Sequence, residues 1–251
     1  MQDDYAESDA LRSFTRPRYF HGQLLDVRHF ESEQNYGKRK QWVLNRLVNG
    51  FGVVCGLDVQ VGDDDHSVVV LPGLALDKGG REIVVSCRSK KIPIAPRPTQ
   101  EGTNGEDHCD DDWVHLVICY RECNTDPEPV LAGGCEDTAR CSPGAIREGY
   151  ELYLEPGKAP DVPLDSVIPG LIKGNNVNYR ALVDWVSAPC DCQSGSSCIT
   201  LANIHLPAGD KTVEPSDIDI SVRPIVYGLD LLWELVLSLS HETPNRRTGK
   251  Y

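Results

Sequence analysis

The chain has 251 residues, which is enough to bury a hydrophobic core as one large domain or two small ones. Its 22 glycines and 17 prolines make it rich in turns, and this favours many short strands over a helical bundle. The net charge of -13 argues against a nucleic-acid backbone or an anionic membrane as the main partner.

No apolar run follows Met1, and no stretch of the sequence is long and apolar enough to span a membrane. We therefore expect a chain without a secretory signal that is synthesised and assembled in the cytoplasm.

An extended arm followed by a long helix is predicted at the N-terminal end, and we interpret residues 1–50 as an assembly segment. A proline near its start keeps residues 16–25 extended. Asp26 is a good N-cap for a helix over residues 27–48, which an Asn-Gly pair ends. Apolar residues stand at both ends of this helix, but residues 31–40 are almost wholly polar. Such a middle is typical of a solvated helix or of one that packs against its own copies.

After residue 50 the pattern changes to short apolar strands separated by glycine and proline turns. This predicts a mainly β fold with one long N-terminal helix and a C-terminal helix, its strands forming an antiparallel meander, a sandwich or a barrel-like domain over residues 51–224. Residues 225–251 are expected to form the C-terminal helix and a tail, with Leu229, Leu232, Trp233 and Val236 on one apolar stripe of the helix. Strands are expected within residues 53–61, 67–71, 74–77, 81–86, 113–120, 151–154, 182–186, 199–206 and 218–222.

Ten cysteines are unusual for a chain made in a reducing compartment. Cys55, Cys87 and Cys119 fall in predicted strands, where a thiol is most often a small buried hydrophobe. The other candidates lie in two predicted irregular excursions, residues 122–146 and 190–198. Loop thiols gain little from burial, so we expect them to bind a metal or each other. These loop cysteines are Cys123, Cys135, Cys141, Cys190, Cys192 and Cys198.

Three states of the loop cysteines stay open at this point. A structural zinc needs four ligands, commonly in two close pairs, and no clean CxxC motif is present. Disulfides and free thiols are the other two states. A metal or a bridge would offset the entropy cost of closing long loops.

No motif for catalysis stands out. The sequence contains no GxSxG elbow, no phosphate-binding GxxxxGK[ST] loop and no HExxH pair, and its histidines are scattered. The acidic runs at residues 63–65 and 110–112 lack the alternating ligands of a calcium loop. We therefore expect no catalytic residues and no enzymatic activity.

Several motifs together are far more specific than any one of them. An Arg-Tyr-Phe start is followed by a polar helix ending in Asn-Arg-Leu and by a Gly-Val-Val-x-Gly-Leu strand. Further stretches are VVVLPGLALDKGGREIVV, YREC followed by TDPEPV, CSPGAIREGYEL and CITLANIHLP. The residues of the first three motifs are Arg18, Tyr19, Phe20, Gly22, Leu24 and Leu25; Asn45, Arg46 and Leu47; and Gly52, Val53, Val54, Gly56 and Leu57.

Across most of residues 16–207 this combination resembles a family of bacterial proteins encoded with phage-tail-like contractile injection systems. A weaker likeness relates the arm, the helix and PGLALDKGGREI to attachment regions of phage baseplate and tail-fibre proteins. The resemblance implies a structural or adaptor subunit that binds other subunits of a tail-like particle, forms a homo-oligomer (a trimer or a dimer), and can leave the cell in a released particle. The residues expected to make assembly contacts are Arg18, Tyr19, Phe20, Leu24, Leu25, Phe30, Trp42 and Leu47.

Two other functions are kept as alternatives. A glycan- or receptor-binding module at the particle tip would need exposed aromatic residues in loops, whereas Trp113 and Trp185 fall in predicted strands. A zinc-dependent hydrolase would need an open coordination position and a general base beside it.

Overall fold

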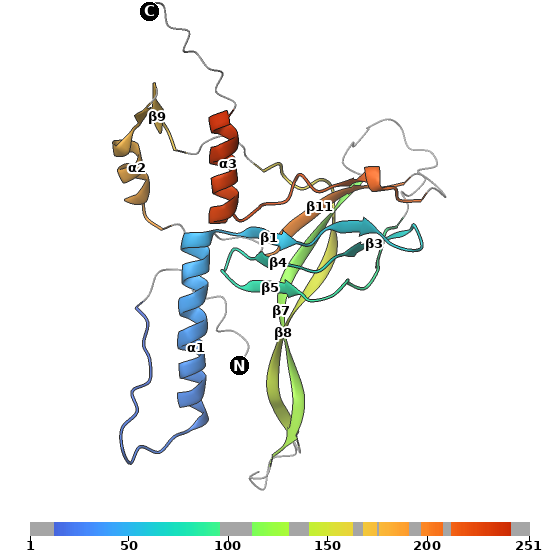
Figure 1. The fold of residues 1–251 in the computed structure, drawn as a ribbon. Coiled ribbons are helices and arrows are strands. Elements are labelled where there is room, and N and C mark those ends of the chain that lie inside the picture. The colour runs from blue at the N-terminus through green and yellow to red at the C-terminus, as the bar shows by residue number, and fades with distance from the viewer. Residues whose placement is uncertain are drawn as a thin grey trace, which may run out of the picture. The chain divides into compact units, whose positions relative to one another are not determined.

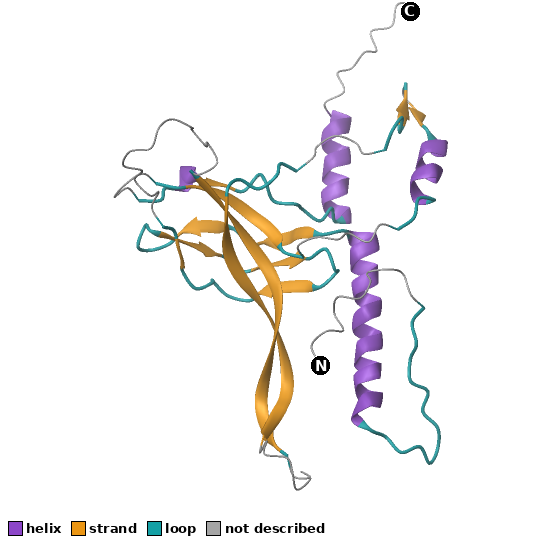
Figure 2. Cartoon of the chain, turned by 180° about the vertical axis from the view of Figure 1, so that it is seen from behind, coloured by secondary structure: helices purple, strands orange, loops and turns teal. Residues whose placement is uncertain are grey.

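Antiparallel strands dominate the structure, a computed structural model that describes residues 13–95, 112–130, 141–162, 168–174, 176–190, 197–207 and 212–241. The prediction of a mainly β fold with an N-terminal and a C-terminal helix is confirmed (Figures 1 and 2). By its internal contacts the chain divides into two units, Met1–Lys40 with Pro160–Ser196, and Gln41–Ala159 with Ser197–Tyr251.

The first unit contains the arm, most of helix α1, and a small hairpin followed by a short helix. Asp26 begins α1 as predicted: its carboxylate accepts a hydrogen bond from the Val27 N–H at 2.7 Å, and the His29 ring accepts one from the Asp26 N–H. The elements are α1 (Val27–Leu44), β9 (Ile172–Lys173), β10 (Asn176–Val177) and α2 (Tyr179–Val186).

Three sheets build the second unit, with strand orders β1-β4-β5, β2-β3-β6 and β12-β11-β7-β8. The strands are β1 (Gly52–Gly56), β2 (Val59–Val61), β3 (Ser67–Val70), β4 (Gly73–Leu76), β5 (Glu82–Val85), β6 (Ile92–Pro93), β7 (Trp113–Pro129), β8 (Cys141–Pro156), β11 (Ile199–His205) and β12 (Ile218–Asp219). Its helical elements are the π-helix η1 (Asn45–Asn49), the 3-10 helix η2 (Pro215–Asp217) and the α-helix α3 (Leu229–His241). The π-helix η1 directly continues α1. None of the helices among the described residues is long and apolar enough to cross a membrane.

One hydrophobic core joins these sheets. Its fully buried side chains include Leu57, Ile83, Leu116 and Leu201, which come from different strands or from the bend between β1 and β2. The bend itself needs glycine, because Gly56 has a φ of +64° and a Cβ there would collide with the backbone of Pro72 and Gly73. The chain therefore passes from one small sheet to the other at a position that only glycine can occupy.

The segment 122–146 was predicted to be an irregular excursion, and this is wrong for its described part. β7 and β8 continue as a two-stranded ribbon beyond the sheet, with paired residues out to Pro129 and Cys141 (Figure 2). Most side chains of the ribbon are exposed, so the backbone ladder rather than burial defines it. Apolar alternation is therefore missing from its sequence.

Two further elements differ from the prediction. Residues 182–186 belong to helix α2 and not to a strand. The C-terminal helix begins at Leu229 rather than at residue 225, because Ile225 forms a β-bridge with Val53. The Val53 N–H donates a hydrogen bond to Pro224 O, and the Val226 N–H donates one to Val53 O. A long-range contact thus overrides the local helical pattern.

The turn between β4 and β5 fixes the position of the segment that follows α1. Asp77 is fully buried and accepts hydrogen bonds at 2.8 Å from the N–H groups of Gly79 and Arg81, and its second oxygen lies 2.6 Å from Arg81 Nε. The side chain of Asn45 donates to Gly80 O at 2.9 Å and to Glu82 at 2.7 Å. Gly80 has a φ of +86°, and a Cβ there would collide with the Trp42 carbonyl. The Asn-Arg-Leu and DKGGRE motifs therefore form one structural joint.

Replacing Asp77 with alanine should lower the free energy of unfolding by roughly 3–5 kcal/mol, because the turn amides and the Arg81 guanidinium lose their buried acceptor. Asp63→Ala is the matched control, since it removes an exposed pair with Arg88 and should cost no more than about 1 kcal/mol. Urea unfolding of both variants measures the difference. Equal losses would show that the buried carboxylate has no special role.

Candidate functional site

The arm is held along the first part of α1 by two aromatic contacts. The hydroxyl of Tyr19 donates a hydrogen bond to Glu33 at 2.8 Å, and this bond raises the pKa of Tyr19. Further along the helix, the ring of Phe14 meets the ring of Tyr36 edge-on, with 6.3 Å between their centroids. The extended arm therefore runs back beside α1 (Figure 1).

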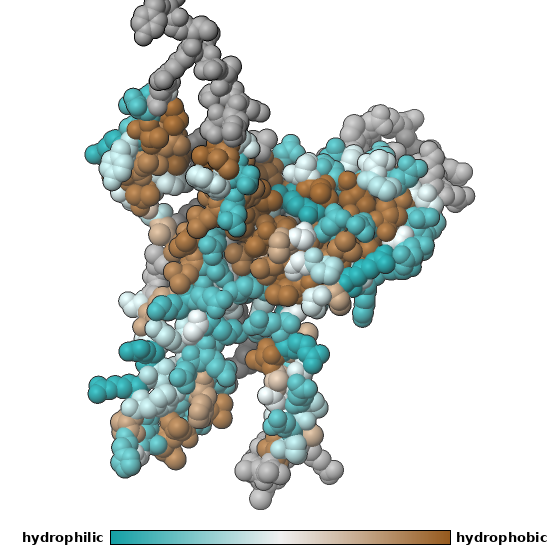
Figure 3. Space-filling model, viewed as in Figure 1, coloured by the Kyte–Doolittle hydropathy of each residue, from teal (hydrophilic) through white to brown (hydrophobic). Residues whose placement is uncertain are grey.

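Apolar side chains of the arm and of the first turn of α1 face solvent. Leu24 is 88% exposed and Phe20 is 68% exposed, and no residue of α1 is buried. Figure 3 shows apolar surface at this end of the arm. We call this set the arm surface; its members are Tyr19, Phe20, Leu24, Leu25, Val27 and Phe30.

The remaining residues predicted to make assembly contacts are divided between the two units. Arg18 is exposed in the arm. Trp42 and Leu47 lie after Lys40 and so belong to the second unit, where Trp42 is half-buried beside Gly80 and Leu47 is exposed. The structure thus brings six of the predicted residues into one segment and leaves these two in the other.

A disulfide joins Cys119 of β7 to Cys198, the residue before β11. The two strands are neighbours, and Ile118 pairs with Ile199. Cys119 was predicted to be a buried thiol; its burial is confirmed, but it is bonded rather than free. The prediction that Cys198 binds another loop cysteine or zinc is wrong, because its partner is Cys119 on strand β7.

The other loop cysteines are only partly described. Cys123 and Cys141 are exposed on the ribbon, and Cys141 pairs with Pro129, which is six residues from Cys123 along β7. Six residues of strand span roughly 20 Å, too far for two ligands of one zinc ion. Cys190 is exposed, and Cys135 and Cys192 lie outside the described residues. Cys123 and Cys141 therefore do not share one zinc ion, and a structural zinc that uses at most one of these two cysteines stays a prediction.

Cys55 and Cys87 are exposed, so the prediction that they are buried is wrong. Cys55 follows a bulge between Val53 and Cys55, where the pairing with β4 shifts by a residue, and the shift turns it outward. Cys87 lies beyond the end of β5.

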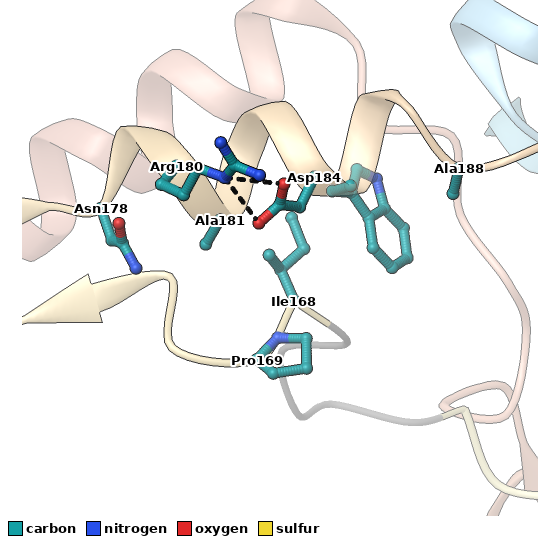
Figure 4. A pocket seen from close by; sticks show the side chains of 8 residues that line it. Ile168, Pro169, Asn178, Arg180, Ala181, Asp184 and Ala188 are labelled. Carbon is teal, nitrogen blue, oxygen red and sulfur yellow. Dashed lines mark hydrogen bonds and ion pairs between the residues drawn. The ribbon is translucent and has the colours of Figure 1, made fainter.

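A shallow hollow of about 400 Å³ lies beside α2 in the first unit (Figure 4). Its polar lining is already satisfied, because Arg180 pairs with Asp184 at 2.9 Å and the Asn178 amide donates to Gly170 O at 3.0 Å. The rest of the wall is apolar and includes Trp185, which is half-exposed. The hollow therefore suits an apolar side chain better than a polar substrate.

Both described histidines of the main sheet contact neighbouring side chains or backbone carbonyls. His115 lies 3.2 Å from Glu155 and 2.9 Å from Gly157 O. His205 packs on the ring of Trp113, with 4.9 Å between centroids, and the Lys158 ammonium lies 3.9 Å from that ring. Within the described residues no three His, Cys, Asp or Glu side chains are grouped to hold a metal ion.

No protein-family model matches the chain, and no curated protein matches it. Among solved structures the chain is similar to a crystal structure of TssK, with a TM-score of 0.40 and 11% sequence identity. The match covers 82% of this chain and 41% of that chain, so this chain spans less than half the length of its structural neighbour. A likeness of this degree assigns neither a family nor a function.

The oxidised chain should be more stable than the Cys198→Ala variant by about 2–4 kcal/mol, because the bridge closes a loop between residues 79 positions apart. Cys123→Ala removes an exposed, unbridged thiol and should change stability by less than about 0.5 kcal/mol. Denaturant unfolding without reductant measures both. Peptide mapping that finds Cys119 and Cys198 alkylated before reduction would contradict the bridge.

Proposed function

We propose that this chain is a structural adaptor subunit of a contractile injection system or another phage-tail-like particle. It would act at the baseplate periphery or at a fibre attachment point, bind other subunits and its own copies, and be made and assembled in the cytoplasm. The motif resemblance over residues 16–207 supports the particle class.

The observation that carries the adaptor role is the arm surface. An arm held by Tyr19 and Phe14 against its own helix presents Leu24 and Phe20 to solvent. Large apolar side chains that are exposed on one segment favour a protein partner, because covering them removes apolar area from water. The polar middle of α1 keeps the surface confined to one end of the segment.

The alternative functions have less support. Trp113 is covered by Lys158 and His205, so it does not offer a platform to a glycan. Trp185 borders the hollow beside α2, but the polar side chains there are already engaged, Arg180 with Asp184 and Asn178 with Gly170 O. Neither aromatic residue is arranged with free polar groups, as sugar recognition requires.

Leu24→Asp should reduce incorporation into the particle by at least about tenfold, because it places a charge at the most exposed apolar residue of the arm surface. The unfolding midpoint should stay nearly unchanged, since a side chain that is 88% exposed adds little to the stability of the fold. The measurement is the amount of tagged chain that co-sediments with particles from the native host.

Val84→Asp is the matched control, because Val84 is an apolar residue with 58% exposure but belongs to β5 in the second unit rather than to the arm. It should incorporate like the natural chain. Normal incorporation of the Leu24 variant would exclude the arm surface as the site of attachment, and the absence of any particle in wild-type preparations would exclude the proposed function itself.

A further inference from the structure

Helix α3 is apolar on several sides and yet exposed. Leu229 is 85% exposed, Leu239 67% and Val236 54%, so the rest of the second unit does not cover them. Figure 3 shows apolar surface over this helix. A helix of this kind is stable in water only when a partner covers its apolar side, because short helices gain most of their stability from packing.

The exposed residues follow a heptad pattern. Leu229, Leu232, Val236 and Leu239 are separated by three, four and three residues, which is the spacing of the a and d positions of a coiled coil. All four are exposed. We call this set the α3 seam.

The positions of the charged residues on α3 indicate what kind of helix can pack against its seam. Asp230 and Glu234 take the b and f positions, which point away from a seam partner. The flanking e and g positions hold Trp233 and Leu235 rather than charges. A different helix would normally be selected by complementary charges at e and g. A seam with apolar flanks and outward acids instead fits its own copy, because two identical helices then meet without placing like charges together.

We propose that α3 is a self-association helix, whose seam packs against the α3 seam of other copies of this chain. The inference deepens the proposed function, on which its setting in a particle rests, by naming the element through which copies meet. Two heptads are short, so the association should depend on concentration. The apolar flanks widen the contact beyond a narrow two-helix seam and allow a bundle of more than two copies.

Sedimentation equilibrium of the purified full chain tests the proposal. We expect reversible oligomers of the natural chain, and an association constant at least about 100-fold lower for the double variant Leu232→Glu with Val236→Glu. Leu231→Glu with Ser238→Glu is the matched control, because it adds the same charge at the c positions of the helix and should still associate. Far-UV circular dichroism verifies that each variant is folded.

A photoreactive benzophenone residue at position 232 provides a second measurement that does not depend on weakening the helix. It should form covalent dimers whose cross-linked peptides join α3 to α3, and the same probe at position 234 should form few. A natural chain that is monomeric at all concentrations, an oligomer unaffected by the seam variant, or cross-links confined within one chain would overturn the proposal. Since these measurements use purified protein, their outcome is independent of particle incorporation.

Discussion

One buried charge fixes the joint on which the second unit depends. The Asp77 carboxylate holds the N–H groups of Gly79 and Arg81, and this gives the β4–β5 turn a single conformation. In that conformation the Gly80 carbonyl meets the Asn45 amide, so the turn positions the chain segment after α1. On its other side the Arg81 guanidinium lies 4.8 Å from the ring of Tyr120, where burial raises the pKa of the tyrosine and a hydrogen bond to Glu122 adds to it. The turn therefore connects the end of the helix to the central strand β7.

Local signals in the sequence predict some parts of the fold well and others poorly. Strand positions up to residue 86 agree with the prediction within a few residues, because glycine turns and apolar alternation are local signals. The exception is the predicted run over residues 53–61, which forms two strands, β1 and β2, in different sheets. The ribbon of β7 and β8 was not predicted, since its exposed side chains follow the chemistry of a loop while its backbone pairs. The start of α3 depends on a contact between Ile225 and Val53, which no local pattern contains.

Some residues of the candidate site are predictable from the sequence, and others are not. Exposed apolar residues such as Phe20 and Leu24 could be selected from their motif, because an apolar arm before a polar helix is visible in the sequence. The disulfide partner of Cys198 could not be predicted in this way, because cysteine connectivity depends on which strands become neighbours and not on spacing. Cys119 and Cys55 both follow apolar residues in the sequence, yet Cys119 is buried and bonded to Cys198 whereas Cys55, which follows the bulge in β1, is exposed.

The edges of the β7–β8 ribbon carry prolines and charges, whereas the arm surface and the α3 seam are apolar. An unpaired strand edge can form hydrogen bonds with the strands of other chains. Prolines and charged side chains on the edge oppose this pairing. Pro127, Pro129 and Pro143 remove N–H donors from the ribbon, and Glu122 and Glu148 face each other across it. The arm surface and the α3 seam differ from the ribbon, since their exposed side chains are apolar. The ribbon therefore limits pairing at its edges, whereas the arm surface and the α3 seam leave apolar side chains open to a partner, and this is the distribution expected if the proposed assembly contacts form there.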